Sequence, residues 1–540
     1  MKKNPKHKPQ PAAPMAVNRA PPGRLKAFCA MDGDATFVWT RWLMLRAVGL
    51  LFIVIFWGVI ADSRALLGPD GITPVTETLT SLRQQFSNPL MAFLAAPGLF
   101  WLNAGWGMIV LLQWLGMMAA VALTLNLWPR LAAFTCWLMF LSFTSSSPFF
   151  AQTQPDPLML ELALLCIPFA PAGVRPGLAV TSGPRPLVVF AVRLMLLRLM
   201  LQAGLAKFVF GGAMWHNFTA MDVMYETAPF PTILGHLLHP WPHWFHAMEI
   251  GVTILAEGVA PFAMVFGGRR GRWFAFLFWA FFQLGIQFTN NFAWLNVGAI
   301  GLALILLDDQ MLAGAAQRLR LSRLAAAMRG KMARIVPARP KPWALYSLRV
   351  ALGVQFFMAL CFYVVSPVRI APERMPAVIT EPMKALGPFY GANAYTLFGS
   401  LPLVRYEVEF QGSNDGGETW RTYEFRYKIQ QPDRMSPFVA PWYPRFDAIL
   451  QHVRVAHTAP ELYLATAERL LQRKPAVMEL FRNDPFPERS ATVIRMVDYR
   501  YHYTDRATWL ATGRYWDKTV IGDWLPMMYL NAQGEIVTAQ

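Results

Sequence analysis

Charged side chains are scarce in this sequence. Only 15% of its 540 residues are Asp, Glu, Lys or Arg, whereas 55% are hydrophobic, and the mean hydropathy is +0.32. A soluble protein with several domains needs more charge on its surface than this. The shortage therefore excludes that class and predicts that much of the chain faces lipid, which suits its 39 Phe, 28 Met and 20 Trp residues.

Cysteine and the motifs of common soluble enzymes are scarce as well. The sequence has four cysteines, and Cys136, Cys166 and Cys361 lie inside apolar runs without short spacing. We therefore expect neither a disulfide framework nor a metal site, and we interpret these three as small buried side chains. The sequence also lacks a glycine-rich phosphate loop, a G-x-S-x-G motif and a CxxC pair. These gaps disfavour an ordinary hydrolase, kinase or thiol oxidoreductase and leave a membrane enzyme open.

Nine apolar runs predict a multi-pass α-helical membrane bundle with about nine hydrophobic spans. The runs cover residues 42–61, 104–126, 131–148, 157–171, 187–211, 249–267, 273–289, 293–307 and 344–366. Those at 157–171 and 293–307 are shorter than the ~20 residues of a straight span, so a re-entrant course is open for them. Residues 1–24 are rich in Lys, Pro and Ala without an apolar core, which predicts a disordered basic tail rather than a signal peptide.

The distribution of charge predicts an orientation for these spans. Residues 1–366 contain 29 Lys+Arg and 13 Asp+Glu, a net charge of +16, whereas the remainder contains 20 and 19, a net charge of +1. The basic residues cluster between apolar runs, as in cytoplasmic loops that contact anionic lipid, and they do not predict a nucleic-acid groove. With a cytoplasmic tail and nine spans, the positive-inside rule places residues after 366 on the periplasmic or lumenal side.

The last third of the sequence predicts a folded extramembrane domain. Residues 406–410 and 422–427 alternate apolar and polar side chains around Asn414-Asp415-Gly416-Gly417, which is a β-hairpin signal. Helical spacing follows over 459–482, and alternation returns over 493–503. We therefore expect three parts: a disordered basic cytoplasmic tail (1–38), a polytopic transmembrane domain (39–366) and a C-terminal strand-rich α+β domain (367–540).

Six ionisable side chains lie inside the apolar runs, where an unpaired charge is unfavourable. They are Glu161, Arg193, Arg198, Lys207, Glu249 and Glu257. Arg193 and Lys207 are 14 residues apart, close to four helical turns, and so share a helix face, whereas Arg198 lies on another. We expect an intramembrane polar site in which Glu249 and Glu257, on adjacent sides of the following long helix, are natural partners of these cations; in a membrane enzyme, Glu161 and Glu257 would be the counter-ions. Two interpretations stay open: structural ion pairing, and a catalytic or transport site with Lys207 and Glu257 as the candidates.

A histidine-rich segment, 212–248, follows the fifth run. It contains His239-Pro240-Trp241-Pro242-His243-Trp244-Phe245-His246. The two prolines prevent a regular helix that would bring His239 and His243 to one face, and no H-E-x-x-H motif accompanies them. We therefore expect an interfacial loop rich in Trp and His rather than a metal site.

Short motifs follow one another along nearly the whole chain. In the hydrophobic part they lie at residues 67–74, 156–161, 198–207, 215–221, 225–231, 257–261, 291–296 and 306–309. Their loop residues include Asp70, Gly71, Trp215, Thr219, Tyr225, Glu226, Thr227, Asn291 and Asn296. In the C-terminal part the motif residues include Asn414, Asp415, Trp420, Pro441, Arg445, Asp447, Asp498 and Arg500. Over residues 39–524 this ordered set resembles the motifs of the lipase maturation factor family.

Four positions depart from that family pattern. Met224 and Trp442 stand where the family has histidine, Ala228 stands in place of glutamine, and Asn290 stands in place of glycine. Any chemistry that those polar groups perform in relatives is lost or done otherwise in this chain.

The resemblance implies a membrane-anchored factor that assists the folding of secreted lipases or other exported proteins. The C-terminal motif residues would bind this client on the non-cytoplasmic face, in the endoplasmic reticulum membrane of a eukaryote or the inner membrane of a bacterium. We predict a chaperone-like protein without a cofactor, whose partners are membrane lipid and the client and not nucleic acid. The membrane half is also similar to the horizontally transferred transmembrane domain of the vitamin K-dependent carboxylase group. The alternative is therefore a membrane-embedded enzyme or a protein that binds a lipid or quinone.

Overall fold

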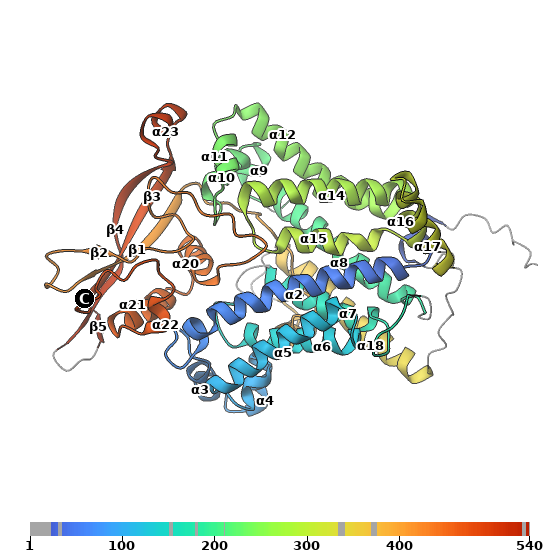
Figure 1. The fold of residues 1–540 in the computed structure, drawn as a ribbon, viewed down its shortest axis with the longest axis horizontal. Helices are drawn as coiled ribbons and strands as arrows, with labels where there is room; N and C mark the ends of the chain where they lie inside the picture. Colours follow the sequence, from blue (N-terminus) through green and yellow to red (C-terminus); the bar gives the residue numbers. More distant parts are fainter. Residues whose placement is uncertain are drawn as a thin grey trace, which may run out of the picture.

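The structure of the chain, a computed structural model, has a helical bundle at one end and a sheet domain at the other (Figure 1). It describes residues 23–30, 35–150, 155–178, 182–209, 211–332, 341–368, 375–531 and 536–538. The sheet domain is C-terminal, as the sequence predicted, and helices form the rest.

Helices occupy each of the nine predicted apolar runs. They are α2 (Val38–Leu67), α5 (Trp106–Thr124), α6 (Pro129–Ser145), α7 (Pro155–Phe169), α8 (Pro186–Phe208), α12 with α13 (His243–Ile254 and Ala260–Phe266), α14 (Gly268–Asn290), α15 (Leu295–Ala303) and α18 (Pro342–Val368). Among the described residues, five helices are long and apolar enough to cross a membrane: α2, α5, α8, the α12–α13 pair and α18. A sixth span results if α15 and its 3-10 turn continue into α16 (Asp309–Arg318), from which they are bent by 102°.

The predicted count of nine spans is therefore not confirmed. Helices α6 and α7 have 17 and 15 residues, which is short for a straight crossing. Helix α14 has 23 residues, but it begins with Arg269, Arg270 and Arg272 and carries Gln283 and Gln287 near its end. Hydrophobicity along the sequence locates these helices and does not decide which of them cross the bilayer.

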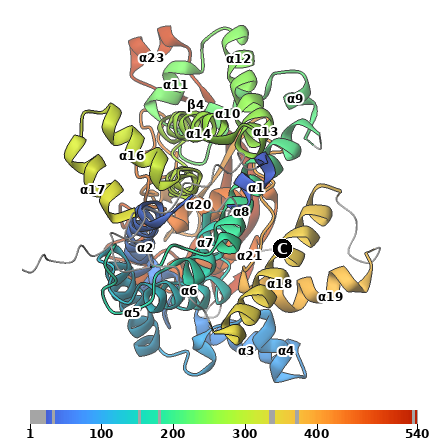
Figure 2. The same cartoon turned by 90° about the vertical axis from the view of Figure 1, so that its right-hand side faces the viewer.

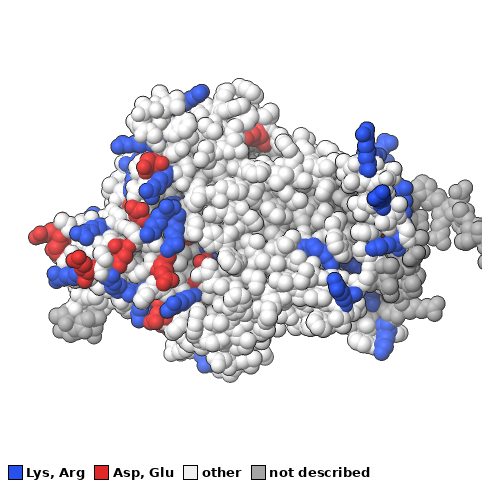
Figure 3. Space-filling view, in the orientation of Figure 1, with Lys and Arg blue, Asp and Glu red and all other residues white. Residues whose placement is uncertain are grey.

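The surface of the bundle is a largely uncharged belt between two charged ends (Figure 3). The end formed by α16 and α17 (Ser322–Met332) shows Lys and Arg, whereas the sheet domain at the opposite end shows both signs of charge. Figure 2 looks at the basic end, with α8 near the middle of the bundle and α18 at its edge. In the most apolar stretch of each helix, 72% of α8 is buried but only 17% of α18. Helix α8 is thus in the core of the bundle, and α18 lies at its edge with little of this stretch buried.

The C-terminal domain is built on an antiparallel sheet. Its strands are β1 (Arg405–Ser413), β2 (Arg421–Thr422), β3 (Val493–Tyr503), β4 (Trp516–Leu530) and β5 (Ile536–Thr538), in the order β2-β1-β3-β4-β5. The predicted hairpin is confirmed by the pairing of Gln411 with Thr422, although β2 has two residues only. The predicted strand at 493–503 coincides with β3.

Helices of the C-terminal domain lie between its sheet and the bundle. They are α20 (Arg445–Ala456), α21 (Glu461–Leu471) and α22 (Pro475–Met478), of which α21 and α22 fall in the predicted helical stretch (Figure 1). One hydrophobic core runs through both parts, and the rings of Phe149 and Phe446 meet at 6.3 Å between them. The two parts therefore pack as a continuous body.

Smaller helices complete the structure. They are α1 (Arg24–Phe28), α3 (Val75–Gln85), α4 (Pro89–Ala95), α9 (Ala213–His216), α10 (Ala220–Thr227), α11 (Ile233–Leu238), α19 (Ala377–Leu386) and α23 (Arg506–Thr512). The predicted disordered tail, residues 1–38, is too long, because it includes helix α1, whose Phe28 is 5% exposed and packs in the core. Most of the predicted tail, residues 1–22, lies outside the described residues.

Candidate functional site

Helix α8 carries three buried cations, and each has its own set of partners. Near the start of the helix, Arg193 Nη1 donates to the carbonyl oxygens of Ala27 (3.0 Å) and Phe28 (2.8 Å). Lys207 lies about 21 Å further along, given a rise of 1.5 Å per residue. The six predicted ionisable residues therefore do not form a single cluster, although Lys207, Glu249 and Glu257 line the same cavity.

The middle cation, Arg198, pairs with Glu161 of α7 at 2.7 Å. Glu161 also accepts hydrogen bonds from the hydroxyl of Tyr395 (2.8 Å) and from the amides of Asn393 and Gln355 (both 3.2 Å). Both carboxylate oxygens are thus bonded within the protein, and Glu161 is fully buried. This geometry is that of a structural ion pair, which ties α7, α8 and α18 to the segment after α18.

Lys207 forms the third group, with Nζ 2.9 Å and 2.8 Å from the two carboxylate oxygens of Glu257. Glu257 lies in a π-helical turn, Leu255–Val259, between α12 and α13. Pro261 explains this turn, because it has no N–H for the carbonyl oxygen of Glu257 and its ring would clash with that carbonyl. The predicted Glu-x-x-x-Pro motif therefore widens the helix at the residue that pairs with Lys207.

A glycine allows the two helices to meet at this point. A Cβ atom added to Gly204 of α8 would lie 2.9 Å from the carbonyl oxygen of Glu257 and 3.0 Å from its Cβ. Glycine is therefore needed for the close approach of α8 to the π-helical turn, which brings Lys207 and Glu257 within bonding distance.

Glu249 bonds to neighbours from the histidine-rich segment rather than to a cation of α8. It accepts a hydrogen bond from the hydroxyl of Tyr225, and its other oxygen lies 2.9 Å from Nδ1 of His246. The segment is only partly a loop, because α9, α10, α11 and the start of α12 take up most of it. Helix α12 begins at His243, after the two prolines, so His239 and His243 do not share a helix face, as predicted.

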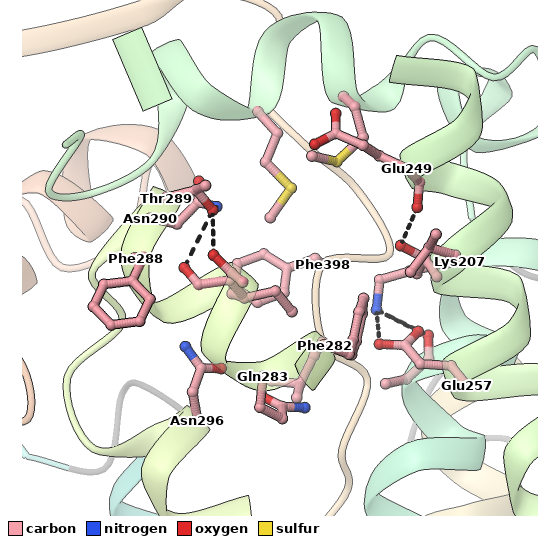
Figure 4. A pocket seen from close by; sticks show the side chains of 18 of the residues that line it. Lys207, Glu249, Glu257, Phe282, Gln283, Phe288, Thr289, Asn290, Asn296 and Phe398 are labelled. Carbon is pink, nitrogen blue, oxygen red and sulfur yellow. Dashed lines mark hydrogen bonds and ion pairs between the residues drawn. The ribbon is translucent and has the colours of Figure 1, made fainter. Parts of the chain in front are cut away.

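A cavity of about 470 Å³ lies between α8, α12, α14 and α15, with the Lys207–Glu257 pair in its wall. Figure 4 shows this pair on one side of the cavity and Asn290 and Asn296 on the opposite side. Most of the remaining lining is apolar and includes Leu199, Met200, Trp215, Met248, Phe282 and Phe398. The volume lies within the range of about 300–1,000 Å³ that is typical of small-molecule sites in proteins.

A second constellation joins the bundle to the C-terminal domain. Arg445 of α20 forms a bidentate ion pair with Asp156 of α7, with N–O distances of 2.6 Å and 3.0 Å, and both side chains are 1% exposed. Asn291 donates its amide to the carbonyl oxygen of Pro437 (3.0 Å) and accepts from the N–H of Ala440 (2.9 Å). These bonds hold the start of α20 and the loop before it on the bundle.

The histidine-rich segment supplies a third part of this joint. Arg405 of β1 is buried and donates to the backbone carbonyls of Glu226 (3.1 Å) and Ala228. The carboxylate of Glu226 lies 2.8 Å from His502 of β3 and 3.6 Å from His239. Burial raises the pKa of Glu226 and lowers the pKa of His239 to about 4, so His239 is neutral at pH 7.

The remaining loop residues of the predicted motifs are also held by contacts. Asp70 pairs with Lys474 at 2.7 Å, and the carbonyl of Gly71 accepts from Arg469 (2.9 Å), which links the loop after α2 to α21 and to the start of α22. Trp215 donates its indole N–H to the carbonyl of Phe398 (2.9 Å). The hydroxyls of Thr219 and Thr227 donate to carbonyls within their own turns. Many of the motif residues therefore lie at the joint between the two parts of the chain.

The predicted client-binding residues divide into a buried group and a more exposed group. Arg445, Asp447 and Asp498 are at most 4% exposed. Asp498 is paired with Arg454, at 3.0 Å. The more exposed residues are Asn414, Asp415, Trp420, Pro441 and Arg500. Sequence reasoning missed Arg405 and the role of Asp156, although a carboxylate at the edge of the apolar run 157–171 was a signal for the latter.

Asp447 makes the stability of the C-terminal domain depend on pH. Its carboxylate accepts from the backbone N–H groups of Tyr427 (2.9 Å) and Lys428 (3.0 Å), and burial raises its pKa to about 6. Because the pKa of Asp447 in the folded state exceeds the usual 3.8, the folded state favours the protonated carboxyl group. The stability that this protonation contributes is fully present below pH 4 and is lost as the pH rises through 6. We expect Asp447→Asn to flatten the change in thermal midpoint between pH 4 and 7.5. The exposed Asp433→Asn should leave that profile unchanged, and an unchanged profile in Asp447→Asn would contradict the assignment.

Known protein families and relatives match nearly the whole chain. The model of the lipase maturation factor transmembrane domain matches residues 39–314, and that of the lipase maturation factor C-terminal domain matches residues 391–526. The chain is 26% identical to lipase maturation factor 1 of Bos taurus, over 96% of this chain and 93% of the relative. It is 27% identical to lipase maturation factor 1 of Mus musculus (92% and 88% covered) and 26% identical to lipase maturation factor 2 of Rattus norvegicus (90% and 83% covered). No solved structure matches the chain.

These comparisons confirm the resemblance that the motifs carried, and none of them supports the alternative of a membrane enzyme. The first model alone spans residues 39–314, just over half of the sequence, and the second accounts for most of the sheet domain. The chain therefore belongs to the lipase maturation factor family.

Proposed function

We propose that this protein is a membrane-anchored maturation factor that presents its C-terminal domain to newly exported proteins, with secreted lipases as the first client class to test. The relatives that cover most of the chain are named for lipase maturation. The observation that carries the proposal is the buried Arg445–Asp156 pair, because it fixes the domain to the bundle at the end opposite the basic loops. A client would therefore meet a domain of defined orientation.

The side of the membrane follows from charge. The basic end of the bundle, around α16 and α17, is cytoplasmic by the positive-inside rule. The C-terminal domain lies at the opposite end and so faces the lumen or periplasm, where exported chains fold.

Strand β4 is the surface that we assign to the client. Val520 and Ile521 are 61% and 53% exposed there, and Thr519 of β4 pairs with the exposed Arg500 of β3. Exposed apolar side chains beside a charged group are what a protein-binding surface needs, because burying them supplies affinity while the charge limits wrong partners. Arg445 and Asp447 would act indirectly, by holding the domain in place.

Site-specific photo-crosslinking in native membranes tests this proposal. A photoreactive residue at Val520 should link exported polypeptides, and the same residue at Leu319, which is 72% exposed at the basic end, should not. The amount of active client should also fall when the protein is removed. A co-expressed secreted lipase serves as the defined client for this measurement. Equal capture from both positions, or a lipase yield that does not depend on the protein, would overturn the proposal.

A further inference from the structure

The cavity beside Lys207 and Glu257 has an apolar entrance on the outside of the bundle. Its lining includes Met248 of α12 and Phe281 and Phe288 of α14, which are 50%, 70% and 53% exposed. Since α12 belongs to a candidate span, an entrance beside it opens toward the bilayer. A molecule that reaches the cavity by this entrance comes from the membrane.

The charges in the wall do not select a charged ligand. Lys207 and Glu257 are bonded to each other through both carboxylate oxygens, so together they are neutral. Glu249, the other carboxylate in the wall, has one oxygen bonded to the hydroxyl of Tyr225 and the other to His246. Another unpaired charge in this cavity would be desolvated without a counter-ion, which is strongly unfavourable. The wall therefore favours an uncharged head group.

Two amides on the opposite side have hydrogen-bonding groups without partners in the described structure. Asn290 and Asn296 line the cavity and are each 2% exposed. Oδ1 of Asn290 and Nδ2 of Asn296 are buried and make no hydrogen bond. A ligand that satisfies both must offer one donor and one acceptor, because buried polar groups are nearly always bonded.

The orientation of the Asn290 amide follows from its neighbour. The hydroxyl of Thr289 donates its proton to the carbonyl oxygen of Gly285 (2.9 Å), so it can only accept from the amide of Asn290, 2.7 Å away. That contact fixes Nδ2 toward Thr289 and leaves Oδ1 as an acceptor that needs a donor.

We propose that this cavity binds an uncharged acyl lipid with a free hydroxyl group, such as a mono- or diacylglycerol taken from the bilayer. Both amide atoms are closed to the cavity in this conformation, so each amide turns toward the ligand when it binds. The hydroxyl then donates to Oδ1 of Asn290, an ester carbonyl accepts from Nδ2 of Asn296, and an acyl chain lies along the apolar wall. A quinone fits less well, because its carbonyls only accept and leave Asn290 unsatisfied. Water fits less well too, since most of the wall is apolar and gives it few partners.

The test uses the full chain in phosphatidylcholine nanodiscs with a photoactivatable diacylglycerol as the probe. We expect labelling of α12 and α14 that unlabelled diacylglycerol displaces and that neither fatty acid nor quinone displaces. Asn296→Leu removes one hydrogen bond and should weaken labelling about tenfold. Ala299→Phe, which places a ring in the cavity, should abolish it.

Stability separates loss of the ligand from loss of the fold. Asn296→Leu removes a polar group that is unsatisfied without ligand, so its thermal midpoint in lipid-free detergent should equal or exceed that of the unchanged protein. Gln113→Leu changes a buried amide far from the cavity, where Gln113 accepts from Ser63, and should label normally. The proposal would be overturned if Asn296→Leu and Ala299→Phe were labelled as strongly as the unchanged protein. Displacement of the probe by fatty acid or quinone, or no labelling of the unchanged protein, would also overturn it. Because no client is present, none of these results depends on the proposed maturation function.

Discussion

Replacing Arg445 with methionine should destabilise the folded protein by about 3–5 kcal/mol, the usual result of removing one member of a buried ion pair. The carboxylate of Asp156, which is fully buried, would lose its bidentate partner. The contact that fails is the one between α7 and α20. We therefore expect a lower thermal midpoint, and protease cleavage between the bundle and the sheet domain that the unchanged protein resists.

Two further variants make this result specific to the buried pair. Arg445→Met combined with Asp156→Asn also removes the buried negative charge and should recover much of the lost stability. Arg434→Met breaks an ion pair with Glu424 that is half-exposed and 3.7 Å long, so it should cost less than about 1 kcal/mol. If the single Arg445 variant is as stable and as protease-resistant as the Arg434 variant, the buried pair does not hold the domain.

Glu161→Ala should have an effect of similar size inside the bundle. It removes the acceptor of Arg198, Tyr395 and Asn393 together, and it leaves the guanidinium of Arg198 buried without a counter-ion. The expected loss is again about 3–5 kcal/mol, which reduces the amount of folded protein in the membrane. Size-exclusion chromatography after heating gives the thermal midpoint and the folded fraction in one measurement.

The matched change for Glu161 is glutamine. Glu161→Gln keeps an acceptor for Tyr395 and loses the charge, so it should fall between alanine and the unchanged protein. Glu161→Leu with Arg198→Leu should be better tolerated than Glu161→Ala, because neither charge then stays unpaired. If Glu161→Ala is folded and also blocks the maturation of a client, the carboxylate has a functional role that its bonds within the protein do not explain.

Local patterns predicted much of the secondary structure. The helices follow from apolar runs, the break before α12 follows from Pro240 and Pro242, and β3 follows from the alternation over 493–503. The π-helical turn at Glu257 could have been predicted from Pro261, because a proline has no N–H to bond to the carbonyl oxygen four residues before it in the same helix. The number of crossings was not predictable in this way, since α6, α7 and α14 are apolar helices whose length or polar residues fall short of a clear span.

The sequence by itself determined the class of this protein, its division into an apolar helical part and a sheet domain, and the residue types available for pairing, because these depend on composition and on periodicity along one segment. Only the tertiary structure decided which charges meet. Arg445 and Asp156 are 289 residues apart, and Glu226 and His502 are 276 residues apart. Contacts over such separations depend on how helices and sheet pack in three dimensions, and so does the cavity, whose walls come from several helices that are separate in the sequence.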